Sequence, residues 1–141
     1  MSRLLPVGPR PRPKRPGRRP GYTEIAVRVD FLYWEGCPSH EEALERLRTV
    51  LREERVAAAI AVTRVETEED ARALRFPGSP TIRIDGQDIQ PPEHAADGRL
   101  TCRLYVLEDG RPSPLPSSAM IRRAVRAAAA AESPAPPGAN P

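Results

Sequence analysis

The strongest constraint on the fold is a strand–helix–strand pattern in the first half of the chain. Residues 25–33 are β-branched and apolar, which is typical of a buried strand. Residues 38–55 carry apolar side chains at helical spacing, and residues 57–65 form a second extended, apolar run. Two strands joined through a helix lie parallel with a right-handed crossover, so this pattern predicts an α/β domain.

Further elements extend the predicted sheet. Thr67 and the acidic residues after it predict a short helix that ends near Leu74. An Asp85-Gly86 turn predicts a hairpin between two short strands. The expected order is β-α-β-α-β-β-α, a mixed sheet flanked by helices, with an insertion before the last helix. The later segments are strands over residues 79–84 and 87–90, an extended run over residues 102–107, and a helix capped by Ser117 or Ser118 that ends near Ala131.

The two ends of the chain differ from the part between them. Residues 1–21 are rich in proline and arginine, and residues 132–141 hold four of the 18 prolines. Neither segment has enough periodic apolar side chains to offset the entropy cost of ordering. We therefore expect a disordered basic arm, a folded domain over residues 22–131 and a disordered tail.

The excess of basic charge belongs to the arm. Seven of the 22 lysines and arginines lie in the first twenty residues, which hold no acid, so the remainder carries about four more acids than bases. The domain itself is therefore not expected to bind nucleic acid. The arm is either a solvated extension or a contact for a nucleic acid or an acidic partner.

The cysteine content points to redox or metal chemistry. No apolar run approaches the roughly 18–20 residues that a membrane helix needs, and the start lacks the apolar region of a secretory signal. We therefore expect a cytoplasmic protein without a membrane partner. Because thiols stay mostly reduced in that compartment, two cysteines favour reactive thiols over a structural disulfide. We expect no cofactor, and the sequence does not indicate an oligomeric state.

Cys37 is the first candidate for a reactive thiol. It lies between Gly36 and Pro38, where the first strand gives way to its helix. Because proline is favoured at the first position of a helix, Pro38 predicts that Cys37 is the N-cap. Its sulfur would then lie beside free backbone N–H groups and the positive end of the helix dipole. That environment favours the thiolate, although nearby glutamates oppose it. The alternative is a small buried apolar residue.

Two more residues are candidates for catalysis with Cys37. His40 lies one helical turn after Cys37, where it could stabilise a thiolate, accept a proton, or be a solvated first-turn residue. Cys102 lies in the insertion that begins at Pro91, which can fold over the same end of the sheet and carry Cys102 toward Cys37. Cys102 is then either a resolving thiol or an apolar strand residue.

Substrate-binding candidates lie near the same end of the sheet. Pro80 follows Ser79 at the start of a strand, where a proline needs an edge or a terminus because it cannot donate to the ladder. Trp34 precedes the cysteine turn, where it either contacts substrate or packs in the core. We predict Ser79, Pro80 and Trp34 as substrate-binding residues and find no metal-ligand set.

These motifs carry a resemblance to a known superfamily. A strand followed by Trp-Glu-Gly-Cys-Pro-Ser-His at 34–40, and Gly-Ser-Pro-Thr at 78–81 opening another strand, resemble the thioredoxin and glutaredoxin superfamily. The resemblance implies a redox cysteine at Cys37 and a cis-proline at Pro80 packed against it. Residues 25–126 are most similar to small bacterial members, some labelled alkylmercury lyase, which share a late stretch seen here as Thr-Cys-Arg-Leu-Tyr at 101–105.

The chain departs from the usual Cys-x-x-Cys motif, because His40 takes the place of the second cysteine. Exchange would then run through Cys102 or through a small thiol. We therefore expect a thiol–disulfide oxidoreductase whose partner is a small thiol or a protein disulfide. The alternatives are an organomercurial or soft-metal site on both cysteines, with Glu35 or Asp97 as acid, and a non-catalytic binding module.

Overall fold

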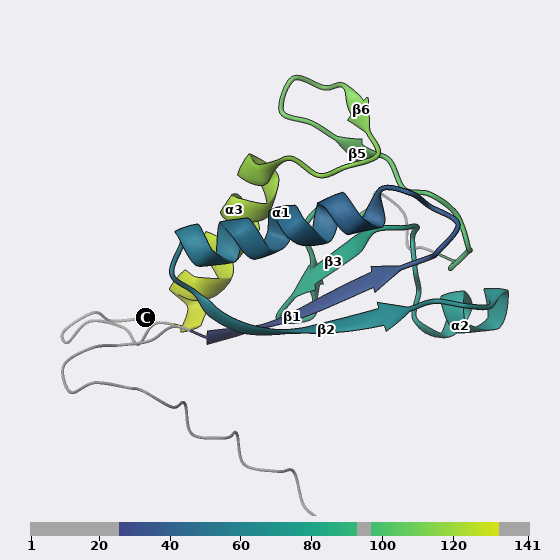
Figure 1. Ribbon diagram of the computed structural model, residues 1–141, viewed down its shortest axis with the longest axis horizontal. Coiled ribbons are helices and arrows are strands. Elements are labelled where there is room, and N and C mark those ends of the chain that lie inside the picture. Colours follow the sequence, from purple (N-terminus) through teal and green to yellow (C-terminus); the bar gives the residue numbers. More distant parts are fainter. Residues whose placement is uncertain (1–25, 93–96, 133–141) are drawn as a thin grey trace, which may run out of the picture.

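A computed structural model of the protein describes residues 26–92 and 97–132 (Figure 1). The expected arm over residues 1–21 lies outside the described residues, as does the expected tail except for Glu132. Within the described residues, no helix has the length and apolar character to cross a membrane.

A mixed four-stranded sheet forms the centre of the molecule. Its strands are β1 (Ala26–Tyr33), β2 (Ala57–Arg64), β3 (Thr81–Ile84) and β4 (Gln87–Asp88), in the order β2-β1-β3-β4. β1 pairs in parallel with β2 along its whole length, as the strand–helix–strand pattern predicts. β3 and β4 then add antiparallel strands, so the α/β class and the mixed sheet are confirmed.

Three helices accompany the sheet. α1 (His40–Glu53) and α3 (Ser118–Glu132) lie side by side on one face, as Figure 1 shows. The short α2 (Glu68–Ala73) lies at the end of β2, capped by the Thr67 side chain, which accepts the Asp70 N–H at 2.9 Å. These positions match the three helices expected from the sequence.

Consecutive residues of β1 belong to two different apolar clusters, because side chains along a strand alternate between the two faces of the sheet. Phe31 is fully buried in the cluster between the sheet and helices α1 and α3. Leu32 points to the opposite face, where it joins Val65, Ala71 and Phe76 under α2. Both faces of β1 are therefore covered at the end of the strand that leads to the cysteine turn.

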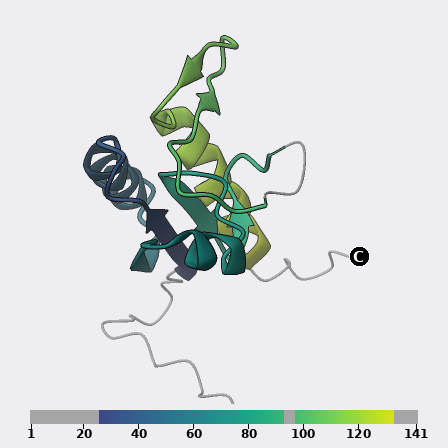
Figure 2. The same ribbon diagram turned by 90° about the vertical axis from the view of Figure 1, so that its right-hand side faces the viewer.

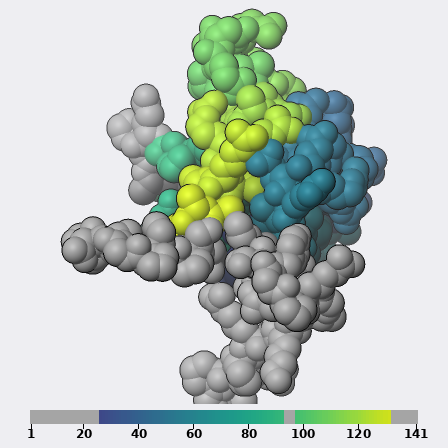
Figure 3. Space-filling view, turned by 90° about the vertical axis from the view of Figure 1, so that its left-hand side faces the viewer, coloured from purple at the N-terminus to yellow at the C-terminus, as the bar shows by residue number. Residues whose placement is uncertain are grey.

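The insertion between β4 and α3 is less regular than expected. The run 102–107 contains only the short strand β5 (Tyr105–Val106), which pairs with β6 (Pro112–Ser113) in a separate hairpin. Figures 2 and 3 show this hairpin projecting beyond α1 and α3. The preceding residues do not join the main sheet; instead Cys102 forms an isolated parallel bridge with Ser79. The segment is extended, but its partner is a loop.

Candidate functional site

The turn after β1 places Cys37 differently from the expectation. The Cys37 N–H donates to the Trp34 carbonyl at 3.0 Å, so the cysteine still belongs to the turn that leaves the strand. Regular helical bonding starts at Ser39, whose carbonyl accepts the Ala43 N–H at 3.1 Å. Ser39 is the N-cap of α1, and the prediction that Cys37 is the N-cap is wrong. Pro38 lies in the turn rather than at the first helical position.

The Cys37 thiol is buried against the loop that carries Pro80. Only 1% of Cys37 is exposed, and its Sγ donates to the Ser79 carbonyl oxygen at 3.4 Å. The Ser79–Pro80 peptide bond is cis. The Ser79 hydroxyl also binds the cysteine turn, because its oxygen accepts the Trp34 N–H at 3.0 Å. The cysteine turn and residues 78–81 therefore face each other, as the motifs predict.

Residues 99–106, which we call the strap, run along this same loop. The Ser79 N–H donates to the Thr101 carbonyl at 2.8 Å, and the Arg103 N–H donates to the Ser79 carbonyl at 2.8 Å. Cys102 lies between those two bonds and is exposed. The loop and the strap are thus paired like two short strands, with a cysteine at the centre of the pairing.

The pairing makes the two cysteines neighbours. Both are free thiols. The pKa of Cys102 is raised, first by hydrogen bonding with the Cys37 thiol, then by partial burial and by the charge of a Cys37 thiolate. The expectation that the insertion carries Cys102 toward Cys37 is therefore met, and the arrangement can hold two sulfurs within reach of each other.

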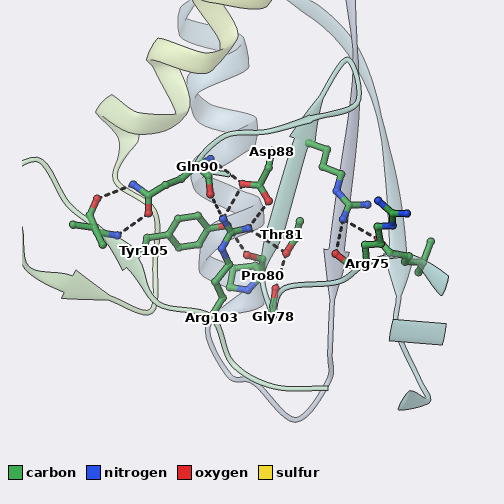
Figure 4. A network of polar contacts seen from close by, with 11 residues as sticks. Arg75, Gly78, Pro80, Thr81, Asp88, Gln90, Arg103 and Tyr105 are labelled. Atoms are coloured by element: carbon green, nitrogen blue, oxygen red, sulfur yellow. Dashed lines mark hydrogen bonds and ion pairs between the residues drawn. The ribbon is translucent and has the colours of Figure 1, made fainter. Parts of the chain in front are cut away.

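A buried arginine fastens the strap to the sheet, as Figure 4 shows. The Arg103 guanidinium binds both carboxylate oxygens of Asp88, at 2.7 and 2.8 Å, and also donates to the Gln90 carbonyl. The Arg103 side chain is 7% exposed and that of Asp88 is 11% exposed. Such a two-pronged, water-excluded pair fixes orientation as well as distance.

Tyr105 completes this network from the next inward position of the strap. Its hydroxyl donates to the Pro80 carbonyl at 2.5 Å, and the Arg103 guanidinium lies 4.4 Å from the centre of its ring. Burial raises the pKa of Tyr105 well above its usual range, and the charge of Arg103 only partly offsets it. Two side chains of the strap, those of Arg103 and Tyr105, therefore hydrogen-bond to the loop that carries the cis-proline.

Asp88, Arg103 and Tyr105 were not identified as site residues from the sequence. Arginine is rarely buried without a partner, so its place within the apolar stretch Cys-Arg-Leu-Tyr-Val-Leu was the available signal. The partner could not be identified in the same way, because Asp88 lies two residues after the Asp85-Gly86 turn, in a region where an exposed acid is common.

His40 and Trp34 lie beside the cysteine turn, but neither side chain hydrogen-bonds to a sulfur of the described residues. The Nδ1–H of His40 donates to the Cys37 carbonyl at 2.7 Å, and its ring stacks on Tyr33 with centres 4.4 Å apart. Trp34 packs over Gly36, and both line an open pocket of about 430 Å³ that also includes Arg64. Among the predicted residues, the described structure therefore brings together Cys37, Ser79, Pro80 and Cys102.

Acids and metal ligands are sparse around the sulfurs. The Glu35 carboxylate binds Arg64, and Asp97 is exposed at the start of the segment that leads to the strap. Within residues 26–92 and 97–132, no group of three or more His, Cys, Asp or Glu side chains could hold a metal ion. The chemistry that the site offers is that of two adjacent thiols.

Comparison with known proteins adds no assignment. No family model matches the chain, and no curated protein or solved structure matches it significantly. A functional proposal therefore depends on the geometry of this site and on the chemistry of its residues.

Proposed function

We propose that the protein has a thioredoxin-like fold and performs thiol–disulfide exchange with the pair Cys37 and Cys102. The observation that carries the proposal is the bridge between Ser79 and the strap, which holds an exposed cysteine beside a buried one. Two adjacent thiols can be oxidised to one disulfide, so such a pair can reduce another disulfide without a third thiol to resolve the mixed disulfide.

The arrangement of the sheet supports the fold part of this proposal. The strand order β2-β1-β3-β4, with the first two strands parallel and the others antiparallel, is the order that the superfamily resemblance implies. A cysteine follows the first strand, and a cis-proline opens the third. The contact between Cys37 and Ser79 joins these two motifs across the end of the sheet.

The reaction balances without a bound cofactor. One cysteine thiolate attacks a substrate disulfide, forms a mixed disulfide and releases one substrate thiolate. The other cysteine attacks its neighbour's sulfur in that mixed disulfide, so the Cys37–Cys102 disulfide forms and the second substrate thiol leaves. Two electrons pass from the protein to the substrate, and two equivalents of an external small thiol return the pair to its reduced form.

The test is the redox titration of the full chain in glutathione buffers. We expect an intramolecular disulfide, identified by mass spectrometry of peptides that join Cys37 to Cys102, and reduction of a disulfide substrate that requires both residues. Cys37→Ser and Cys102→Ser variants should each lose multiple turnover. Full activity in either variant, or two cysteines that stay unlinked in the oxidised protein, would reject the proposal.

The same assay distinguishes thiol–disulfide exchange from the alternative of a soft-metal site. Two adjacent thiols also suit a two-coordinate soft metal ion such as Hg²⁺. Cleavage of a carbon–mercury bond needs, in addition, a proton donor, and Glu35 is engaged by Arg64. Stoichiometric Hg²⁺ binding without disulfide turnover would favour a soft-metal site over thiol–disulfide exchange.

A further inference from the structure

The strap has two faces of opposite character. Arg103 and Tyr105 point inward and are buried, whereas Cys102, Leu104 and Val106 are exposed. This alternation is that of an extended segment, in which every second side chain points the same way, about 6.6 Å apart. The outer row therefore consists of one thiol followed by two apolar side chains.

Exposed apolar side chains are concentrated in this row. Leu104 is 64% exposed and Val106 is 53% exposed, and within the described residues the only other large apolar side chain with comparable exposure is Val62 on β2. A single exposed apolar side chain needs no explanation, but a leucine and a valine beside a thiol in one extended row form a patch of defined shape.

We propose, on the basis of the exchange function above, that Cys102 is the sulfur that meets the substrate, and that the outer row docks an extended apolar segment of another protein that carries the disulfide. Cys37 then acts from beneath, as the resolving thiol. This assignment reverses the roles that the Cys37 motif alone suggests.

Accessibility decides the order of the two sulfurs. Cys37 is 1% exposed, so a substrate disulfide cannot approach its sulfur while the strap is in place, whereas Cys102 is open to solvent. The raised pKa of Cys102 works against it, because less thiolate is present at neutral pH. Each added pKa unit lowers the thiolate fraction tenfold but raises thiolate nucleophilicity roughly threefold, so the net cost is only about threefold. Burial excludes attack altogether, and it outweighs that cost.

The backbone of the strap favours a polypeptide over a small disulfide. No described residue bonds to the N–H or C=O of Leu104, whereas the neighbouring Val106 exchanges both backbone bonds with the Gln90 side chain. An extended peptide can pair with such a free backbone unit while its alternate side chains cover the apolar row. The adjacent Arg103 is committed to Asp88, so it is not free to bind the carboxylates of a small anionic thiol.

The reaction order follows from this geometry. The Cys102 thiolate attacks the peptide disulfide, bonds to one peptide sulfur and releases the other as a thiolate. Cys37 then attacks the Cys102 sulfur, the Cys37–Cys102 bond forms, and the docked peptide leaves as a thiol. The protein pair is oxidised by two electrons and the peptide disulfide is reduced by two.

The docking part is tested with two disulfides. One is the disulfide-linked dimer of the peptide Cys-Ser-Val-Ser-Val, whose valines match the spacing of the outer row, and the other is glutathione disulfide. In the Leu104→Lys/Val106→Lys variant we expect the ratio of kcat/KM for the peptide to that for glutathione disulfide to fall roughly tenfold. Val62→Lys, which adds the same charge at a distant exposed apolar site, should leave that ratio unchanged. An unchanged ratio in the double variant overturns the docking strip.

The order of the sulfurs is tested by trapping. Cys37→Ser should accumulate a mixed disulfide with the peptide on Cys102, whereas Cys102→Ser should react at least tenfold more slowly with the same peptide. Trapping on Cys37 in the Cys102→Ser variant at the rate of the wild type overturns the order. Wild-type turnover of glutathione disulfide shows in the same experiment that the exchange function holds, so failure of this inference is distinguishable from failure of the function itself.

Discussion

Replacing Arg103 by methionine tests how firmly the strap is fastened. Methionine keeps most of the volume of the side chain but removes the guanidinium that binds Asp88, Gln90 and Thr81. The Asp88 carboxylate, 11% exposed, is then left without its cation. We expect this stranded charge, rather than the lost contacts, to dominate the effect on stability.

The size of the effect follows from the geometry. Removing one partner of a buried ion pair costs about 3–5 kcal/mol of unfolding free energy, because the remaining charge stays desolvated. The contact of the guanidinium with the Tyr105 ring, 4.4 Å from its centre, adds about 0.5–2 kcal/mol when it is water-excluded. Since a small domain has about 5–15 kcal/mol in total, we expect Arg103→Met to lose about 3.5–7 kcal/mol, the sum of the two contributions, and to remain only marginally folded.

The assay is urea unfolding followed by the fluorescence of Trp34, the single tryptophan. Arg111→Met is the matched control, because Arg111 binds Asp109 at 2.6 Å in an exposed pair that should contribute less than about 1 kcal/mol. Adding Asp88→Asn to Arg103→Met should recover part of the loss, since the buried charge disappears. A loss in Arg103→Met no larger than that of the Arg111 control would refute this reasoning.

Three further predictions concern the same region. Burial raises the pKa of Tyr105, so the contribution of its protonated hydroxyl to the free energy of unfolding is complete below about pH 10 and is lost as the pH rises further. Urea titrations at alkaline pH should show a loss that approaches about 1.4 kcal/mol per pH unit, and Tyr105→Phe should remove this dependence. Hydrogen bonding with Cys37 raises the pKa of Cys102, so Cys37→Ala should shift the midpoint of Cys102 alkylation to lower pH, and an unmoved midpoint would contradict the contact. Gly98 has φ +90°, and a Cβ there would lie 2.2 Å from a backbone oxygen of α2. Gly110 has a similar φ but open space around it, so thermal unfolding should show that Gly98→Ala destabilises the protein by about 1–3 kcal/mol more than Gly110→Ala.

The regular part of the fold was predictable because its signals are local. The apolar run before Tyr33 and the helical spacing after Pro38 each identify an element, and their order implies the parallel pairing that the sheet has. The Asp85-Gly86 turn takes positive φ at both positions, as such a hairpin requires. These elements bring Cys37 to the end of the sheet, near the turn that carries Pro80.

The start of α1 was less predictable, because two signals competed there. Pro38 suits the first turn of a helix, which favours Cys37 as the N-cap. Ser39 also suits the N-cap position, and the hydrogen bond from Cys37 to Trp34 keeps the cysteine in the preceding turn. Local propensity alone does not decide between them, since the choice depends on how the turn packs against Ser79.

The strap was not predictable in detail, because its partner is distant in sequence and is not a regular strand. The run 102–107 correctly indicates an extended segment, but it does not show that Arg103 binds Asp88 or that Tyr105 binds the Pro80 carbonyl. Only the contact between Arg103 and Asp88, which is distant from the cysteines' own motifs, shows that this arginine holds the segment that carries Cys102. The two rows then have linked roles: the inner row, through Arg103, holds the strap in register with Ser79, and the outer row thereby keeps Cys102 above Cys37. A substitution that loosens the inner row should therefore change the reactivity of both sulfurs, even though it touches neither.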